Sequence, residues 1–345
     1  MKIYRAAIAG LGFIGAGDQV SGDKLGQKVV NLDGTHFSAY EKNARINLIS
    51  GSSRDSGRRS RFKDKCGARV YKDWQDMLRG EQIDIISVAT YTPYHEEIVL
   101  ASVEAGIKII YCEKPIASTL SGAKRMFDKC AAAGCSLVIN HQRRFNSNYQ
   151  FSKSLIESGK LGKITSITAE WASGRLGNVG THVIDAIFML SSMLPKAVSG
   201  RLDSTKKPDC RGQEFDDPGA WGCIDLGEQT LVTVNAPAKS QAPFHIKINC
   251  EFGYLITGGL TAKYGYWNSE DQNLVDVQGN STSMDNAVEN IVNYLDGKES
   301  LVYDSKEALY SLETIIGFHA SHNLDSKWVQ LPLSGPDLDI LLSSG

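Results

Sequence analysis

The sequence has no run of about 18 apolar residues, so no segment is long enough to span a bilayer as a helix. Neither sign of charge dominates, because 37 basic side chains stand against 39 acidic ones and the formal net charge is −2. This balance gives no reason to expect a nucleic acid or an anionic membrane as a partner. Internal repeats and low-complexity tracts are absent as well.

Cysteine spacings typical of metal sites are also missing. Seven cysteines are scattered along the chain without a CxxC or Cys/His pattern. We therefore expect no metal site, and reduced thiols, which fit a cytoplasmic protein best. The N-terminal sequence MKIYRAAIAGLGFIG contains an apolar stretch that glycines interrupt. We interpret it as a strand and a turn rather than as a signal peptide.

Two different rhythms predict two domains in these 345 residues. Residues 1–145 alternate buried apolar runs with helix-like segments, which predicts an α/β domain with a doubly wound parallel sheet. Residues 146–345 contain strands that alternate apolar and polar residues, which predicts an α+β domain with a large open, mostly antiparallel sheet. We expect this second domain to bind substrate and to form a homodimer or homotetramer through its open sheet face. The apolar runs of the first domain are YRAAIAG, RINLIS, IDIISVAT, IKIIYC and SLVIN.

One connection in the first domain is unusually long. Residues 16–45 separate the first glycine-rich loop from the second predicted strand. A single crossover helix needs fewer residues, so we expect a helix and an inserted loop.

A glycine-rich loop, GLGFIG, directly follows the first predicted strand. Gly10 would allow a tight turn, Gly12 would let the backbone approach a pyrophosphate, and Gly15 would let the next helix pack closely. Phe13 and Ile14 would begin that helix, whose first N–H groups would face the phosphates. The pattern predicts dinucleotide binding, and the alternative is an incidental turn in a chain with 33 glycines.

The end of the second predicted strand bears on the choice of dinucleotide. Units that bind NAD often place an acidic residue there to accept hydrogen bonds from the ribose hydroxyls. This chain has Ser53 and Arg54 instead, which favours the 2′-phosphate of NADP. Asp55 is close enough to leave NAD open, and the arginines that follow can also form the solvated face of a helix.

The sequence YCEKPIAST places Lys114 just after the apolar run IKIIYC. Ligands bind at the carboxyl ends of strands in doubly wound sheets. Partial burial lowers the pKa of a lysine, which suits a group that exchanges a proton with a substrate hydroxyl. Glu113 could orient this lysine, and Pro115 stiffens the loop. A solvated surface charge is the alternative.

Several segments, in order along nearly the whole chain, resemble the glucose–fructose oxidoreductase/inositol dehydrogenase/rhizopine-catabolism (Gfo/Idh/MocA) family. The resemblance implies a Rossmann domain followed by an open-sheet domain. It also implies NAD(P)-dependent oxidation or reduction of a sugar, a sugar derivative or a cyclitol. The segments are GLGFIG, VATYTPYHEEIVLASVEAGIKIIYCEKPIA, IESGKLGKI, GTHVID and ASHNLDSKWVQLPL.

The resemblance also implies roles for individual residues. His182 corresponds to the catalytic histidine of the family and would share proton transfer with Lys114. Asn178 stands four residues earlier, where the family usually has an aspartate, which puts the share carried by His182 in doubt. Asp185 follows at a spacing that puts it on the same helix face and could compensate or contact substrate. Arg144 resembles a recurrent position near the site.

Thr90 and Tyr91, after the strand IDIISVA, stand where the family places residues beside the nicotinamide. The resemblance also makes His95, Glu113 and Lys114 candidates for cofactor binding. The family commonly reads Thr-Pro-Asn where this chain has Thr90-Tyr91-Thr92, and His95 could equally be a structural cap.

Two other functions stay open at this point. The same residues could serve a glycoside-cleaving enzyme that oxidises its substrate transiently and regenerates its NAD. Asn178 also leaves room for a dinucleotide-binding sensor without catalysis.

Overall fold

The computed structural model describes residues 2–19, 33–205, 212, 215–277, 279–302 and 306–344. Its first half contains a six-stranded sheet in the order β3-β2-β1-β4-β5-β6, and every neighbouring pair is parallel. β4 and β5 are buried at every position, which explains why they are uniformly apolar or small rather than alternating. This confirms the predicted doubly wound parallel sheet. The strands are β1 (Tyr4–Ala9), β2 (Ile46–Ser52), β3 (Arg69–Tyr71), β4 (Ile85–Val88), β5 (Ile109–Cys112) and β6 (Ser136–Ile139).

The order of this sheet defines a switch point between β1 and β4. The chain runs from β1 outward to β3 on one side and from β4 outward to β6 on the other. Ligands of such sheets bind where the strand order reverses, at the carboxyl ends of the strands. The connecting segments are α1 (Phe13–Ala16), α2 (His36–Lys42), α3 (Ser56–Cys66), α4 (Trp74–Gly80), η1 (Thr92–Tyr94), α5 (His95–Glu104), α6 (Leu120–Ala132) and η2 (Gln142–Phe145).

The long connection contains two short helices in its described part. α1 ends after one turn at Gly17, whose φ of 67° is left-handed. α2 begins after Thr35, which forms a capping box with Ser38. The inserted loop predicted between them falls largely on residues 20–32, which lie outside the described residues.

The second sheet has nine strands in the order β14-β13-β12-β11-β7-β10-β9-β8-β15. Its pairs are antiparallel except β7 with β10, so the prediction of a mostly antiparallel sheet is confirmed. The strands are β7 (Ile164–Glu170), β8 (Ala197–Leu202), β9 (Ala220–Asp225), β10 (Leu231–Ala236), β11 (His245–Cys250), β12 (Gly253–Gly258), β13 (Thr261–Tyr266), β14 (Gln272–Val275) and β15 (Val329–Gln330).

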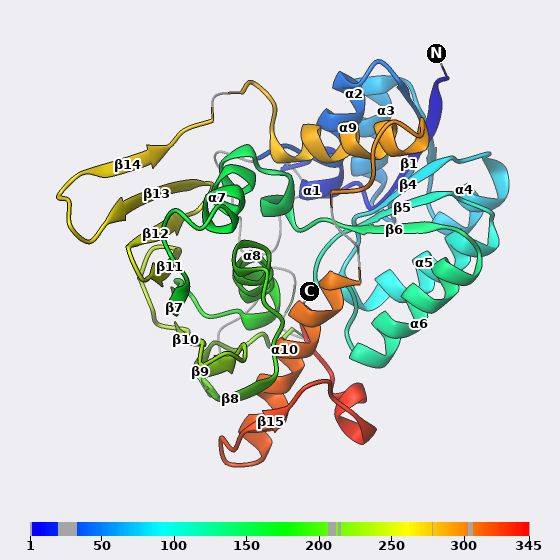
Figure 1. Cartoon of the computed structure of the whole chain (residues 1–345). Helices are drawn as coiled ribbons and strands as arrows, with labels where there is room; N and C mark the ends of the chain where they lie inside the picture. The colour runs from blue at the N-terminus through cyan, green and yellow to red at the C-terminus, as the bar shows by residue number, and fades with distance from the viewer. Residues whose placement is uncertain are drawn as a thin grey trace.

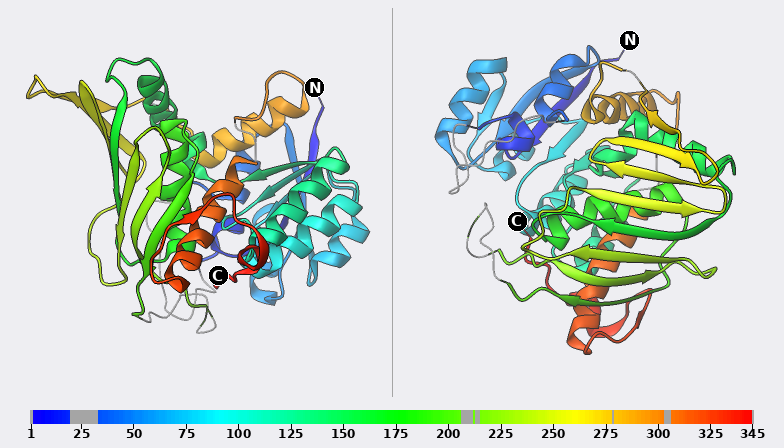
Figure 2. Two further views of the ribbon diagram at one scale, coloured as in Figure 1. Left: turned by 60° about the horizontal axis from the view of Figure 1, so that its bottom comes forward. Right: turned by 90° about the vertical axis from the view of Figure 1, so that its left-hand side faces the viewer.

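Helices cover the face of the second sheet that is turned toward the first sheet. Figure 1 shows this layer, and the second view of Figure 2 shows the opposite face with no described helix in front of it. No helix of the described residues is long and apolar enough to cross a membrane. The remaining helices are α7 (Ser147–Glu157), η3 (Leu176–Gly180), α8 (Thr181–Ser191), α9 (Ser283–Leu295), α10 (Glu307–Asn323) and η4 (Gly335–Asp339).

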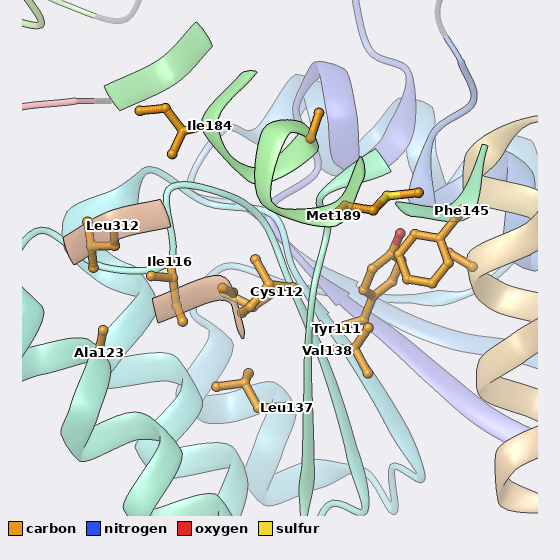
Figure 3. Packing of buried hydrophobic residues seen from close by; sticks show 14 of the residues in the cluster. Tyr111, Cys112, Ile116, Ala123, Leu137, Val138, Phe145, Ile184, Met189 and Leu312 are labelled. Atoms are coloured by element: carbon orange, nitrogen blue, oxygen red, sulfur yellow. The ribbon is translucent and has the colours of Figure 1, made fainter. Parts of the chain in front are cut away.

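Packing joins the two sheets closely. Figure 3 shows side chains of β5 and β6 beside Ile184 and Met189 of α8 and Leu312 of α10, all within one buried apolar cluster. α9 lies far along the chain but packs on the first sheet's side, where Asp285 pairs with Lys42 of α2 at 2.7 Å. A domain boundary between residues 145 and 146 therefore stays a prediction.

Candidate active site

The glycine-rich loop leaves one side of Gly12 open. A Cβ at Gly10, whose φ is 104°, would lie 2.3 Å from the Ala89 carbonyl oxygen, and one at Gly15 would lie 1.9 Å from the Gly10 carbonyl oxygen. A Cβ at Gly12 would meet nothing closer than Arg58 Nη1 at 3.4 Å. The loop's own atoms therefore require Gly10 and Gly15, whereas the position of Gly12 fits a pyrophosphate lying over the backbone.

The helix that follows this loop is too short to contribute much of a dipole. α1 has four residues. Phe13 and Ile14 stand in its first turn, where N–H groups have no acceptor within the helix. The loop would therefore bind a phosphate mainly through hydrogen bonds from these individual N–H groups, and less through a helix macrodipole.

Asp55, which follows β2, caps the helix that begins after it. Its Oδ1 accepts a hydrogen bond from the backbone N–H of Arg58 at 2.8 Å and caps α3. Arg54 is exposed, and its guanidinium lies 5.4 Å from the ring centre of Tyr94. Arg59 Nη1 donates to the carbonyl oxygen of Ser53 at 2.6 Å.

Two further arginines of α3 converge on a buried carboxylate. Asp18 Oδ2 lies 2.8 Å from Arg61 Nη2 and 3.4 Å from Arg58 Nε. Because Arg58 also lies against Gly12, this group sits directly beside the phosphate loop. Its members come from α3 and from the residue after Gly17, and only Arg58 and Arg61 were visible in the sequence as part of a basic run.

Lys114 leaves β5 at the carboxyl end of the parallel sheet and is partly exposed. Its Nζ donates to the backbone oxygen of Asn178 at 3.2 Å and to Asn178 Oδ1 at 3.1 Å. The ammonium of Lys114 is therefore fixed by hydrogen bonds and is not simply a solvated surface charge. Asn178 belongs to η3, so the contact joins the first sheet to the segment before α8.

Glu113 is buried beneath this lysine. Its Oε1 accepts from Asn140 Nδ2 at 2.6 Å and lies 3.1 Å from His36 Nε2, and its Oε2 accepts from the N–H of Lys114 at 3.3 Å. Burial raises the pKa of Glu113, but the His36 hydrogen bond and the Lys114 charge outweigh burial and lower this pKa to about 2. The carboxylate is therefore ionised at neutral pH.

His182 is the second residue of α8 and lies close enough to Lys114 for the charge of the lysine to affect it. Its Nδ1 has no hydrogen-bond partner among the described residues. Burial, followed by the positive charges of Lys114 and Arg143, holds the pKa of His182 well below its usual range. The imidazole is consequently neutral, the form that can accept a proton. Asn178 directs its side-chain oxygen to Lys114.

Asp185 is directed to a different pair of side chains. Its Oδ2 lies 2.9 Å from Arg144 Nε, and its Oδ1 lies 3.1 Å from His141 Nδ1. Burial raises the pKa of Asp185, but the Arg144 charge and His141 outweigh it and hold this pKa far below the usual range. Arg144 also pairs with Glu307 of α10 at 2.6 Å.

The residues after β4 also lie at the carboxyl edge of the first sheet. His95 has one ring nitrogen 2.9 Å from the Pro115 carbonyl oxygen and the other 3.1 Å from that of Thr90, so it links two strand ends. Tyr91 is exposed, and its ring lies 5.7 Å from that of Phe215. Burial lowers the pKa of His95.

Sequence reasoning missed four residues of this neighbourhood. His141 lies 6.3 Å from His182, ring centre to ring centre, and the guanidinium of Arg143 lies 4.4 Å from the ring centre of Phe244. Asp217 accepts from the N–H groups of Gly177 and Asn178 at 2.6 and 2.7 Å. His36 reaches Glu113 from α2. Only the stretch NHQRRF after β6 carried a signal, a cluster of polar residues at a strand end; His36 and Asp217 had none.

No group of three or more potential metal ligands occurs in the part of the chain that the structure describes.

Comparisons with known proteins match part of the chain. Residues 4–141 match the family model GFO_IDH_MocA, described as an oxidoreductase family with an NAD-binding Rossmann fold. An inositol 2-dehydrogenase of Pseudomonas fluorescens (strain SBW25) is 37% identical over 205 residues, which cover 58% of this chain and 59% of that protein. One of Serratia proteamaculans is 31% identical over 226 residues, covering 64% and 65%. The matched region thus spans less than two thirds of these curated relatives.

Solved structures resemble the whole chain in fold. The WlbA dehydrogenase of Bordetella pertussis, in complex with NADH and UDP-GlcNAcA, has a TM-score of 0.77 at 19% identity and covers 96% of this chain and 99% of its own. A levoglucosan dehydrogenase in complex with NADH and levoglucosan has a TM-score of 0.78 at 16% identity, covering 96% and 100%. At these identities the likeness establishes the architecture alone.

Proposed function

Because this chain belongs to the Gfo/Idh/MocA family of oxidoreductases, we propose that it is an NAD(P)-dependent dehydrogenase of CH–OH groups. Its substrate would be a sugar, a sugar derivative or a cyclitol. The relatives named above support this class, since their names refer to inositol, levoglucosan and a UDP-sugar. Bound NAD(P) would accept or supply the hydride.

The position of Lys114 carries this proposal. Its ammonium is held by two oxygens of Asn178 at the carboxyl end of β5 and remains partly exposed. There Lys114 would take the proton from the substrate hydroxyl during oxidation and return it during reduction. His182 is neutral, and its Nδ1 has no partner in the described part of the chain, so it would share that proton or bind a second hydroxyl.

The dinucleotide would lie over the glycine-rich loop. Gly12 and the N–H groups of Phe13 and Ile14 would hold its pyrophosphate, and Thr90 and Tyr91 would lie beside its nicotinamide end. Arg144 and Asp185 form an ion pair, and this pair would stabilise the substrate-binding side of the site.

Within this function we predict that NADP binds at least as tightly as NAD. Asp55 caps α3, and Arg54 is exposed where a ribose carboxylate would otherwise stand. Isothermal titration with each dinucleotide measures the preference, and Arg54→Ala should weaken NADP more than NAD. A clear preference of the parent for NAD would contradict the prediction and leave Asp55 as the ribose ligand.

The function itself is tested with a panel of sugars, sugar phosphates, cyclitols and glycosides. Each is incubated with NAD or NADP, and reduced nicotinamide is followed by absorbance with product analysis.

Lys114→Met keeps the apolar stem but removes the ammonium, so turnover should fall by about 10²–10⁴ while dinucleotide affinity is retained. His182→Ala should lose less. Lys108→Met, an exposed lysine next to the opposite end of β5, is the matched control and should behave as the parent.

Three results would count against the proposal. Unchanged turnover of Lys114→Met with loss in His182→Ala would reverse the two roles. Cleaved glycoside without net reduced nicotinamide would identify the route of transient oxidation instead. Normal binding of dinucleotide with no turnover across the panel would favour a sensor.

A further inference from the structure

A chain of buried polar side chains reaches the lysine from the far side of the first sheet. Tyr40 Oη lies 2.7 Å from Ser87 Oγ, Ser87 Oγ lies 2.8 Å from His36 Nδ1, and His36 Nε2 lies 3.1 Å from Glu113 Oε1. His36 and Ser87 are fully buried, and Tyr40 and Glu113 nearly so. The chain of contacts links α2, β4 and the residue after β5.

The direction of these hydrogen bonds follows from Tyr40. Its hydroxyl has Ser87 as its hydrogen-bond partner among the described residues, and burial raises its pKa, so it remains a phenol. A tyrosine that only accepted from Ser87 would leave its own O–H unpaired in the core, which is unfavourable. Tyr40 therefore donates to Ser87. Among the described residues Ser87 Oγ has only Tyr40 and His36 as partners, so its own O–H is paired only by donating to His36 Nδ1.

This direction determines the state of His36. A nitrogen that accepts a hydrogen bond carries no proton, so His36 is neutral with its hydrogen on Nε2. That N–H donates to Glu113 Oε1, which also accepts from Asn140. Glu113 Oε2 in turn accepts the backbone N–H of Lys114. A carboxylate with three donors is stabilised in its charged form.

We propose that His36 is a positioning residue for Lys114: as a neutral Nε2–H donor it keeps Glu113 ionised and oriented against the lysine backbone. This rests on the proposed function only in that Lys114 exchanges the substrate proton. Among the described residues, the titratable groups around Glu113 and Lys114 are His36 from α2, Cys112 from β5, His95 from α5 and His182 from α8. The ring of Tyr111 from β5 packs against His36 at 4.6 Å. His36 is the first residue of α2, so the helix that follows the long connection carries a residue of the site.

The first test reads the tautomer and needs no turnover. The protein, labelled with ¹⁵N at its seven histidines, is examined by NMR at about pH 7.5, and His36→Gln assigns the signal. Nitrogen shifts of a neutral imidazole protonated at Nε2 are expected for His36. A neutral ring protonated at Nδ1, or an imidazolium, would overturn the proposal.

The second test measures the charge beside Lys114 without a substrate. The rate at which acetic anhydride labels Lys114 is followed against pH by mass spectrometry. Removing a neighbouring negative charge disfavours the ammonium, so the midpoint in Glu113→Gln should lie about one pH unit below that of the parent. Equal midpoints would mean that Glu113 carries no charge that Lys114 experiences, and would also overturn the proposal.

The third test separates positioning from packing by comparing two variants of His36. Gln can donate to Glu113 and accept from Ser87, whereas Leu fills the space and does neither. His36→Gln should keep kcat close to the parent, and His36→Leu should lose about tenfold in kcat with KM and dinucleotide affinity unchanged. Equal loss in both folded variants would contradict the assignment. If His36→Leu does not fold, the tautomer and labelling tests still decide.

Failure of the proposed function remains distinguishable. The parent protein could show no turnover on any substrate and still show the expected tautomer and labelling midpoints. That result would contradict the dehydrogenase assignment but would support the proposed arrangement around Lys114.

Discussion

Lys114 and Asn178 are 64 positions apart in the chain, yet the amide of one binds the ammonium of the other. An aspartate is usual at this place in the family that the chain resembles. Asparagine preserves the contact with Lys114 but adds no negative charge. Asparagine in place of aspartate therefore changes the charge beside Lys114 and so affects the protonation of the lysine. It also leaves His182 without support from this side chain.

Restoring the carboxylate should therefore shift the pH profile. In Asn178→Asp a negative charge would lie about as close to Lys114 Nζ as the present 3.1 Å contact, and it would favour the ammonium. Oxidation requires the neutral lysine, so the midpoint of the rise of kcat/KM with pH should move upward by about one to three units. The profile is measured with a substrate found in the panel. Asn268→Asp, exposed on a turn beyond β13, is the control, and an unmoved midpoint in Asn178→Asp would contradict the assigned contact.

At the scale of elements, the second sheet has one face without a described helix. Trp221, Leu231 and Leu274 are 40%, 45% and 68% exposed, and each adjoins a buried residue on β9, β10 or β14. Alternation places these side chains on the face opposite α7, α8 and α10. Large apolar side chains gathered on one exposed sheet face are typical of a subunit interface.

We predict that this face pairs with a second copy to give a dimer or a dimer of dimers. Light scattering at micromolar concentration measures the mass, and a value near 37.6 kDa would contradict the prediction. Leu231→Lys should weaken assembly because it buries a charge in the interface. Leu324→Lys, 52% exposed just after α10, changes a similar side chain away from the strands and should leave the mass unchanged.

At the scale of the whole molecule, groups whose pKa is shifted by the fold make stability depend on pH. Burial lowers the pKa of His319 to about 4 and holds that of His182 well below its usual range. The unfolded chain takes up these protons near pH 6.5, so this stability is complete above about pH 6.5 and is lost as pH falls toward the folded-state values. Glu113, with a pKa of about 2, adds to the loss below about pH 5.

The melting temperature should accordingly fall between pH 7 and pH 4, measured by scanning calorimetry in matched buffers. For His319 alone the loss is on the order of 3 kcal/mol, because its pKa is about 4 in the fold. His319→Leu should flatten the fall between about pH 6.5 and pH 4. His245→Gln on β11 is the control, and equal slopes in His319→Leu and the parent would show that His319 is not responsible.

Most of the elements could be predicted from local sequence. The mostly apolar runs IDIISV and IKIIYC do not alternate apolar and polar residues, which is typical of strands covered on both sides. The glycines around Gly12 and the lysine after β5 mark one edge of that sheet by their place in the chain. The predicted fold class was confirmed for this reason, because periodicity and turn chemistry are properties of short segments.

The partners of the site residues were decided by packing between distant segments. Asp185 was expected near His182 from helix spacing, yet its carboxylate meets His141 and Arg144 once α8 lies against η2. Likewise Asp217 organises the turn of Asn178 from another loop, and α9 returns to pack beside α2. A buried polar group binds whichever partner the closed core brings within reach, and that partner depends on the approach of helices and sheets rather than on spacing along the chain.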